Sequence, residues 1–565
     1  MNDIRRTLLW VVFTMSLVLL WDAWNKHTGQ PSIFGGTPRP AASAPAAGTA
    51  PGAVPASGVP AAIATTASGS LPAASAAGVP AAAAPAPQAE LLTVSTDVMR
   101  VTLDPRGGTI VGLELLKYAD HNDKGGPVKL LDQSGSRVYV AQTGLISTQA
   151  GAALPNHLTP MSVQPGPREL AAGADALSVS FEATGADGVK LVKTLSFPRG
   201  GYTIGVKHEV TNGSAVPVDP QLYLQLARDG NPPAGESSFY FTFTGPAVYT
   251  DATKFKKIDF KDIEKGKADH AKNASEGWIA MVQHYFTSAW LLPAGVSREF
   301  RTAKVSNNLY SVAMVTSLGA VAPGTAKAQE ATLYVGPQEE YKLAALAPGL
   351  ELVKDYGWLT ILSKPLFWLL TQLHNLIGNW GWAIVALVVL LKAAFYWLNA
   401  SAYKSMAKMK AVNPKVMEMR ERLKDKPQQM QQEMMRMYRE EKVNPLGGCL
   451  PIVVQMPFFI ALYWVLLSSV EMRNAPWVGW ITDLSAIDPW FILPVLMTLS
   501  SLFQVWLNPT PPDPMQAKLM WIMPLAFSFM FFFFPAGLVL YWLTNNILSI
   551  AQQWFINRQL GVLGK

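Results

Sequence analysis

Four hydrophobic blocks in the second half of the chain restrict the fold more than any other feature of the sequence. They occupy residues 380–398, 449–470, 490–507 and 519–550. A helix needs about 20 apolar residues to cross the hydrocarbon core of a bilayer. The last block is too long for one crossing and contains Pro535 and Gly537, so we expect two helices joined by a tight turn. With an apolar segment near the N-terminus, the sequence predicts a polytopic α-helical membrane protein with six transmembrane helices.

The N-terminal part of the chain consists of an apolar segment followed by a low-complexity segment. Residues 1–26 carry Arg5 and Arg6 before an apolar run that ends near Trp21 and Trp24. A cleaved signal peptide is the alternative. Because no small-residue cleavage site follows directly, we favour a retained transmembrane anchor. Residues 27–90 consist mainly of small residues and proline, which cannot bury a core, and they predict a disordered linker.

Residues 91–346 show a different pattern, with short alternating runs separated by turn residues. Examples are residues 98–103, 109–115 and 176–182. Period-two alternation of this kind over about 250 residues is typical of a β-sandwich with many strands. We expect a helical insertion near residues 254–267, where charges have helical spacing. The composition, 50% hydrophobic and 15% charged, agrees with a membrane protein that carries a large soluble domain.

Loop charges orient the predicted spans. Residues 401–445 hold eleven Lys and Arg, whereas residues 470–489 hold only Arg473. Basic loops face the cytoplasm, so both termini are expected there and the β domain on the outer side, which is the periplasm in a Gram-negative cell. The expected segments are an interfacial amphipathic helix region (347–378), the second transmembrane helix (379–400), a cytoplasmic helical hairpin (401–445), the third transmembrane helix (446–470), a periplasmic loop (471–489), the fourth transmembrane helix (490–508), a cytoplasmic loop (509–517), the fifth and sixth transmembrane helices (518–534 and 536–556) and a cytoplasmic tail (557–565).

Lys392 lies about two-thirds of the way along the block at residues 380–398. A lysine at the centre of a transmembrane helix costs roughly 3 kcal/mol, so it normally faces protein or water. One interpretation is a side chain that snorkels to the cytoplasmic headgroups. The other, which we favour, is a positively charged, water-filled cavity between helices.

Other polar residues fall within the apolar blocks. They are Gln455, Thr498, Ser501, Gln504, Thr544 and Asn545. An amide in hydrocarbon needs a hydrogen-bond partner or water. Hydrogen bonds between helices are enough to explain this set. Together with Lys392, the same residues predict one polar concavity.

The expected cytoplasmic hairpin is rich in methionine. Its candidates for substrate capture are Met406, Met409, Met417, Met430, Met434 and Met437. Methionine adapts to irregular apolar partners and is common at promiscuous binding surfaces. Packing of the two helices against each other is the alternative explanation, and the two roles are compatible.

Several ordered motifs resemble the YidC/Oxa/Alb family of membrane protein insertases. The motifs are NPLGGCLPIVVQMPFFIALY at residues 444–463, DPMQAKLM at 513–520, FPAGLVLYW at 534–542 and GNWG at 378–381. Upstream, RGG at 106–108, GWIAM at 277–281 and YVGP at 334–337 resemble the large periplasmic domain of the Gram-negative YidC type. The resemblance covers nearly all the chain except the linker.

This resemblance implies a five-helix insertase core with a hydrophilic groove open to cytoplasm and lipid, and an all-β supersandwich domain in the periplasm. The basic groove residue of the family, usually arginine, falls on Lys392, and its groove glutamine falls on Gln455. Two aromatic groove positions fall on Tyr541 and Trp542, whereas a groove threonine is replaced by Val388.

The implied function is insertion, folding and assembly of inner-membrane proteins, both independently of the Sec translocase and with it. The implied partners are nascent membrane proteins, the ribosome, Sec translocase components and membrane lipids. No cofactor, metal, nucleotide or DNA is expected, because the sequence contains no phosphate-binding loop, nucleophile elbow or paired-cysteine site. Two alternatives remain at this point. One is a solute transporter or channel with an anion site at Lys392, and the other is an anchored envelope enzyme.

Overall fold

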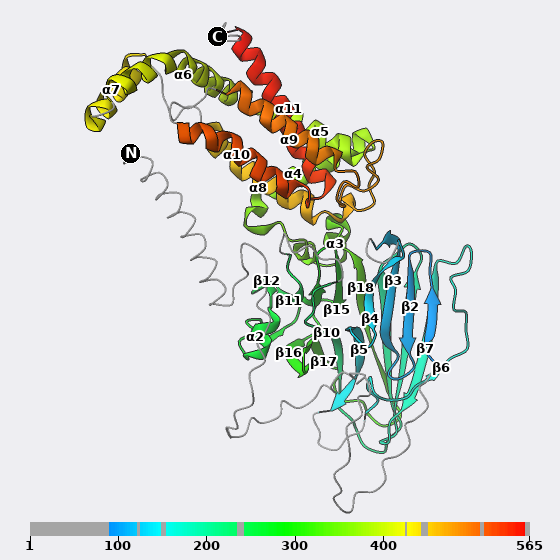
Figure 1. Cartoon of the computed structure of the whole chain (residues 1–565). Helices are drawn as coiled ribbons and strands as arrows, with labels where there is room; N and C mark the ends of the chain where they lie inside the picture. The colour runs from blue at the N-terminus through cyan, green and yellow to red at the C-terminus, as the bar shows by residue number, and fades with distance from the viewer. Residues whose placement is uncertain are drawn as a thin grey trace, which may run out of the picture. The chain divides into compact units, whose positions relative to one another are not determined.

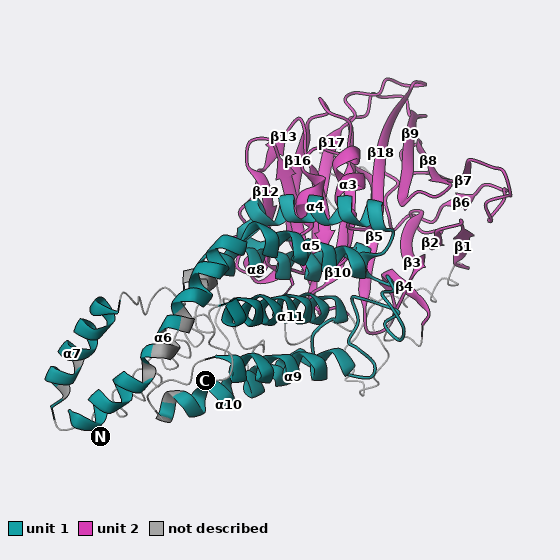
Figure 2. Cartoon of the chain, turned by 90° about the horizontal axis from the view of Figure 1, so that it is seen from above, with its two compact units in different colours: residues 1–38, 355–565 teal, residues 39–354 magenta. Residues whose placement is uncertain are grey.

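The structure, a computed structural model, consists of a β unit that ends at Lys354 and a helical unit that begins at Asp355 (Figures 1 and 2). It describes residues 90–120, 125–147, 154–233, 242–423, 426–441, 450–508 and 514–559. The expected N-terminal anchor, the linker up to residue 89, and residues 446–449, 509–513 and 560–565 lie outside the described residues.

Two nine-stranded sheets with antiparallel pairing make up the β unit. In spatial order, the first sheet contains β1 (Leu92–Ser95), β2 (Met99–Asp104), β3 (Thr109–Ala119), β4 (Pro127–Gln133), β5 (Val138–Ser147), β10 (Pro220–Asp229), β17 (Leu309–Ser317), β16 (Arg298–Ser306) and β13 (Asn273–Ala274). The second contains β12 (Lys254–Lys257), β11 (Gly245–Thr250), β14 (Trp278–Val282), β15 (Phe286–Leu291), β18 (Ala326–Pro337), β9 (Thr203–Asn212), β8 (Val189–Pro198), β7 (Ala176–Thr184) and β6 (Ser162–Val163).

The burial pattern explains how the sheets pack. Along β8 and β9 every second residue is buried, as expected for strands with one face on a core. The two sheets meet through side chains such as Trp290, whose indole N–H donates to the Gln225 carbonyl at 3.1 Å. Tyr139 of the first sheet similarly lies 2.5 Å from the Ser288 hydroxyl of the second. The predicted β-sandwich domain is therefore confirmed.

The expected helical insertion near residues 254–267 is only partly helical. Residues 254–257 form β12 at a sheet edge, and the helix α2 is limited to Phe260–Glu264. The alternation in this segment explains the strand, because it places the Phe255 ring 5.9 Å from the Trp278 ring. Charge spacing alone did not reveal this contact.

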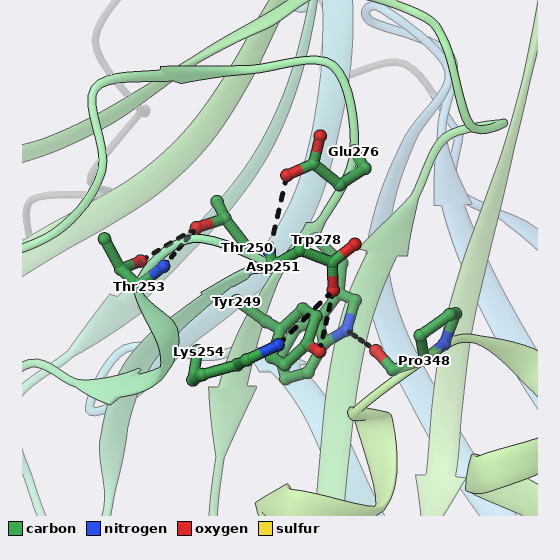
Figure 3. A network of polar contacts seen from close by, with 8 residues as sticks. All are labelled: Tyr249, Thr250, Asp251, Thr253, Lys254, Glu276, Trp278 and Pro348. Atoms are coloured by element: carbon green, nitrogen blue, oxygen red, sulfur yellow. Dashed lines mark hydrogen bonds and ion pairs between the residues drawn. The ribbon is translucent and has the colours of Figure 1, made fainter.

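A short helical segment at the end of the β unit is held against the second sheet (Figure 3). This segment contains α3 (Glu340–Leu346) and the 3-10 helix η1 (Leu350–Val353). Trp278 stacks on Tyr249 at 5.5 Å and donates its indole N–H to the Pro348 carbonyl at 3.1 Å. Gly349 has φ +74°, and a Cβ there would lie 2.3 Å from the Tyr249 ring. Glycine is therefore required between α3 and η1, where the chain passes the Tyr249 ring.

The helical unit contains eight α-helices within the described residues. They are α4 (Thr360–Ile377), α5 (Trp380–Ala394), α6 (Tyr396–Arg422), α7 (Pro427–Glu440), α8 (Leu450–Ser468), α9 (Ile492–Leu507), α10 (Pro514–Phe531) and α11 (Ala536–Gln559), with 3-10 helices η2 (Gly357–Leu359) and η3 (Val470–Met472). In the described part of the chain, none of these helices alone has the length and hydropathy needed to span a membrane. Only α5 together with Tyr396–Ser405 of α6 meets that requirement, as a bent pair.

One continuous helix was expected over residues 380–398, but the structure bends there by 64°. Helix α5 ends at Ala394, and Phe395 leaves the helical conformation before α6 begins. The Phe395 ring packs edge to face on Phe458 of α8, with centroids 5.1 Å apart. The bend places Lys392 in the last turn of α5.

The loop before α9 is fastened to the ends of two helices. Asn379 caps α5 by accepting from the Trp382 amide at 3.1 Å, and it also donates to the Pro476 carbonyl at 3.0 Å. Gly381 follows, and a Cβ there would lie 2.3 Å from the Trp477 ring. The Gly537 amide donates to the Leu484 carbonyl at 2.8 Å. The GNWG and FPAG motifs thus anchor this loop to the helix ends.

Candidate functional site

The helical unit contains a partly open cavity of about 330 Å³ between its helices. It is lined by Val388, Leu391 and Lys392 of α5, Phe395 at the bend, Asn399, Ala402 and Tyr403 of α6, Gln455, Met456, Phe458 and Phe459 of α8, Gln504 and Asn508 at the end of α9, and Tyr541, Asn545, Asn546 and Ser549 of α11. The lining combines aromatic rings with neutral amides and hydroxyls. Among the described residues that line the cavity there is one lysine and no Asp or Glu, so this lining gives the cavity a positive potential.

The Lys392 ammonium is held by α11. Its Nζ donates to the Ser549 hydroxyl at 2.7 Å, and that hydroxyl donates to the Asn545 carbonyl at 2.7 Å. Ser549 and Asn545 are one helical turn apart, so they share a face of α11. No carboxylate in the described part of the chain forms an ion pair with Lys392. Its charge therefore stays available to an acidic group that enters the cavity.

The predicted groove residues divide into two groups. Lys392, Gln455, Gln504, Tyr541 and Asn545 all line the cavity. The remaining predicted residues do not line it: Trp542, Thr498, Ser501 and Thr544.

Three of these residues make contacts elsewhere in the helical unit. The Trp542 ring stacks on Phe459 at 5.3 Å and also packs against Phe531. Thr498 donates to the Pro494 carbonyl within its own helix at 2.8 Å. Ser501 accepts from the Asn546 amide at 3.3 Å, and this bond links α9 to α11. Interhelical hydrogen bonding, the alternative considered for this set, thus applies to Ser501.

The polar lining residues that the sequence reasoning missed include Asn399, Tyr403, Asn508 and Ser549. Asn399 lies beyond the bend, where a straight helix would have placed it differently. Ser549 had a usable signal, because it falls four residues after Asn545 and on the same helical face. Val388, at the family's threonine position, does line the cavity and adds an apolar surface there.

The hairpin of α6 and α7 forms a small apolar core of its own. Val412, Val416 and Met419 are buried, and Met434 and Met437 pack against them. Two ion pairs join the helices, Lys415–Glu441 at 2.6 Å and Arg422–Glu433 at 3.0 Å.

Other hairpin methionines face outward. Met417 and Met435 are each 52% exposed, and Met430 is half-buried. The side chains of Met406 and Met409 lie outside the described part of the structure. Self-packing and an open methionine surface therefore both occur in one hairpin.

The described part of the β unit contains a buried polar cluster in which no acidic side chain pairs with the lysine. Lys193 is 1% exposed and donates to the carbonyls of Gly107 and Thr143. The Thr143 hydroxyl lies 2.9 Å from Nε2 of the buried His208. Burial lowers the pKa of Lys193 to about 7, and burial beside Lys193 lowers the pKa of His208 to about 3. Among the described residues, no group of His, Cys, Asp and Glu is placed to hold a metal ion.

Comparison with known proteins decides the family. A YidC periplasmic domain matches residues 91–369, and a 60Kd inner membrane protein domain matches residues 372–561. The membrane protein insertase YidC of Janthinobacterium sp. (strain Marseille) is 54% identical over 99% of this chain and 100% of its own length. The chain belongs to the YidC family of membrane protein insertases.

Other YidC relatives agree. The insertase of Cupriavidus necator is 56% identical over 99% of this chain and 98% of its own length. Among solved structures, an active YidC insertase is 20% identical with a TM-score of 0.38, and it covers 82% of this chain and 91% of that chain. A galactose mutarotase related enzyme from Lactobacillus acidophilus is 9% identical over 44% of this chain and 97% of its own length, with a TM-score of 0.29. The family assignment rests on the sequence matches.

Proposed function

We propose that this chain is a membrane protein insertase and chaperone of the bacterial inner membrane. The observation that carries the proposal is a cavity whose described lining contains one lysine and no carboxylate, in a chain that is 54% identical to a YidC insertase over 99% of its own length. The same chain acts alone on small substrates and beside the Sec translocase on larger ones. Nascent membrane proteins, the ribosome, Sec components and lipids are its proposed partners.

The proposed topology has six transmembrane helices with both termini in the cytoplasm. The basic loop at residues 401–445 supports a cytoplasmic hairpin, and the β domain is then periplasmic. Helices shorter than the roughly 30 Å hydrocarbon core are accommodated by tilt or local bilayer thinning. A thinner membrane at α10 shortens the path that a polar segment has to cross.

The proposed mechanism uses two surfaces in sequence. The exposed methionines of the hairpin contact a hydrophobic segment as it leaves the ribosome. The cavity then holds the polar segment next to that helix, and Lys392 attracts its acidic side chains. Transfer of about 20 apolar residues into lipid drives insertion without nucleotide hydrolysis.

The experiment that tests this function is insertion into proteoliposomes that contain only this purified chain. A small single-span protein is added without nucleotide, and translocation is measured by protease protection against empty liposomes. We expect clear protection above the empty control. An absence of gain with folded and correctly oriented protein would indicate an obligate Sec accessory. A transporter with an anion site at Lys392 is not favoured, because the chain belongs to an insertase family.

A further inference from the structure

Two pairs of side-chain amides link helices around the cavity. Gln455 of α8 donates its Nε2 to Oδ1 of Asn399 in α6 at 3.0 Å. Gln553 of α11 donates its Nε2 to Oδ1 of Asn508 at 2.9 Å. Asn399, Gln455 and Asn508 line the cavity. Each pair therefore joins helices that come from distant parts of the sequence.

In each pair, one buried polar atom has no hydrogen-bond partner within the described part of the structure. Asn399 is 5% exposed, yet its Nδ2 has no partner within the described part of the structure. Gln553 is 2% exposed, and its Oε1 likewise has no partner there. Buried polar groups are nearly always hydrogen-bonded, so such atoms need an explanation. One unused donor and one unused acceptor remain, which is the combination that a peptide group complements.

The chemistry of these amides differs from that of Lys392. A side-chain amide offers N–H donors and a carbonyl acceptor, whereas an ammonium only donates. An extended polypeptide in a membrane has unpaired N–H and C=O groups at every residue, and each one needs a partner. A peptide group can replace one member of an amide pair with no net loss of hydrogen bonds, because it carries the same two groups.

We propose that the Asn399–Gln455 and Asn508–Gln553 pairs bind the main-chain peptide groups of the polar segment that crosses the membrane. This inference rests on the proposed insertase function. It divides recognition in the cavity into two parts. Lys392 binds acidic side chains of the substrate, whereas the amide pairs bind the main chain of any extended segment regardless of its sequence.

The test compares two substrates that have the same transmembrane segment. One carries an uncharged Gly/Ser tail and the other an acidic tail of equal length. Asn399→Leu keeps the number and branching of side-chain heavy atoms but removes the amide, and Lys392→Gln removes the charge. Gln372→Leu is the matched control, because Gln372 is an exposed amide on α4 that does not line the cavity. Initial insertion rates are measured in proteoliposomes after melting temperatures confirm folding.

We expect Asn399→Leu to slow both tails equally, by about two- to tenfold for the loss of one hydrogen bond. Lys392→Gln should slow the acidic tail alone, and Gln372→Leu should match the unsubstituted chain. The proposal would be overturned if Asn399→Leu lowered the insertion rate of the acidic tail alone, or the rate of neither tail. If the unsubstituted chain inserts neither tail, the insertase function itself fails, and this inference fails with it.

A second measurement does not depend on the folding of a variant. Synthetic tails of glycine and of N-methylglycine differ in main-chain N–H groups, which the second tail lacks. The unsubstituted chain should accelerate the glycine tail more than the N-methylglycine tail, each relative to empty liposomes. Equal acceleration of both tails would show that the acceptor Oε1 of Gln553 does not bind main-chain N–H groups.

Discussion

Lys392 shows how one side chain combines charge and position. Its Nζ donates to the Ser549 hydroxyl at 2.7 Å, but none of the described residues that line the cavity is a carboxylate. Arginine at this position would keep the charge and add a planar fork of donors. Glutamate at position 392 would replace the positive charge in the cavity by a negative one at the same place on α5.

We expect Lys392→Arg to retain most insertion activity and Lys392→Glu to lose it selectively for acidic translocated tails. A reversed charge next to an acidic residue in a site of intermediate polarity disfavours binding by several kcal/mol. Insertion of matched neutral and acidic tails into proteoliposomes measures the effect. Equal activity of both variants on several acidic tails would contradict a charge-based cavity.

Lys193 in the β unit should make local stability depend on pH. The unfolded chain binds a proton at this lysine below its usual pKa of 10.5, but the folded unit does so only below about 7. Folding therefore releases a proton between these pH values, so the free energy of unfolding rises with pH across this range. Below about pH 7 the folded unit carries the full free-energy cost of burying the Lys193 ammonium. From pH 7 to 9 the gain is on the order of 2 kcal/mol.

The measurement is hydrogen exchange of β8 and β9 peptides at several pH values, corrected for intrinsic exchange rates. Lys193→Met should remove most of the rise with pH, because methionine has no proton to release. It should also lower stability at pH 9, since the buried carbonyls of Gly107 and Thr143 lose their donor. Identical pH slopes in the two proteins would refute the assignment to Lys193.

At the scale of elements, the hairpin of α6 and α7 assigns different roles to its methionines. Met419, Met434 and Met437 belong to the apolar core of the hairpin, whereas Met417 and Met435 are half exposed. Residues on opposite faces of an amphipathic helix have different partners. Capture of a substrate segment by this hairpin should therefore depend on the exposed residues.

We expect Met417→Gln with Met435→Gln to reduce cross-linking of a nascent hydrophobic segment to the hairpin, with little effect on melting temperature. Val416→Ala should instead loosen the hairpin by about 1 kcal/mol, since it removes buried methyl groups. Hydrogen exchange of α7 distinguishes the two effects. Full cross-linking in the double variant would place the capture surface elsewhere.

At the scale of the whole molecule, the division into two units separates the β domain from the cavity. All residues that line the cavity lie after Asp355, in the helical unit. The β unit has its own core between two sheets and its own polar cluster. Each unit therefore contains the contacts that stabilise its own fold.

We expect a chain without residues 91–346 to keep inserting a small single-span protein, at about the rate of the full chain. The physical reason is that this deletion removes none of the side chains around Lys392. Proteoliposome insertion measures the rate, and a melting curve checks that the helical unit is folded. Loss of insertion in a folded deletion chain would assign the β unit a direct part in the process.

The sequence by itself determined the classes of structure in this protein. Alternation with period two predicted the β-sandwich, and hydrophobic blocks predicted the helical unit, because both patterns depend on neighbouring residues. Ordered motifs such as the one at residues 444–463 predicted the family. Of the candidate groove residues, Lys392 and Gln455 line the cavity, as the charge and the amide in apolar blocks suggested.

Only the tertiary structure decided which polar groups meet. Ser549 contacts Lys392 from 157 residues away, and Asn399 reaches Gln455 after a bend of 64° that follows α5. Trp542 packs against Phe459 instead of lining the cavity, although it adjoins Tyr541. Local patterns can place residues such as Asn545 and Ser549 on one helical face, but they do not determine such contacts, because these depend on how helices distant in sequence pack together.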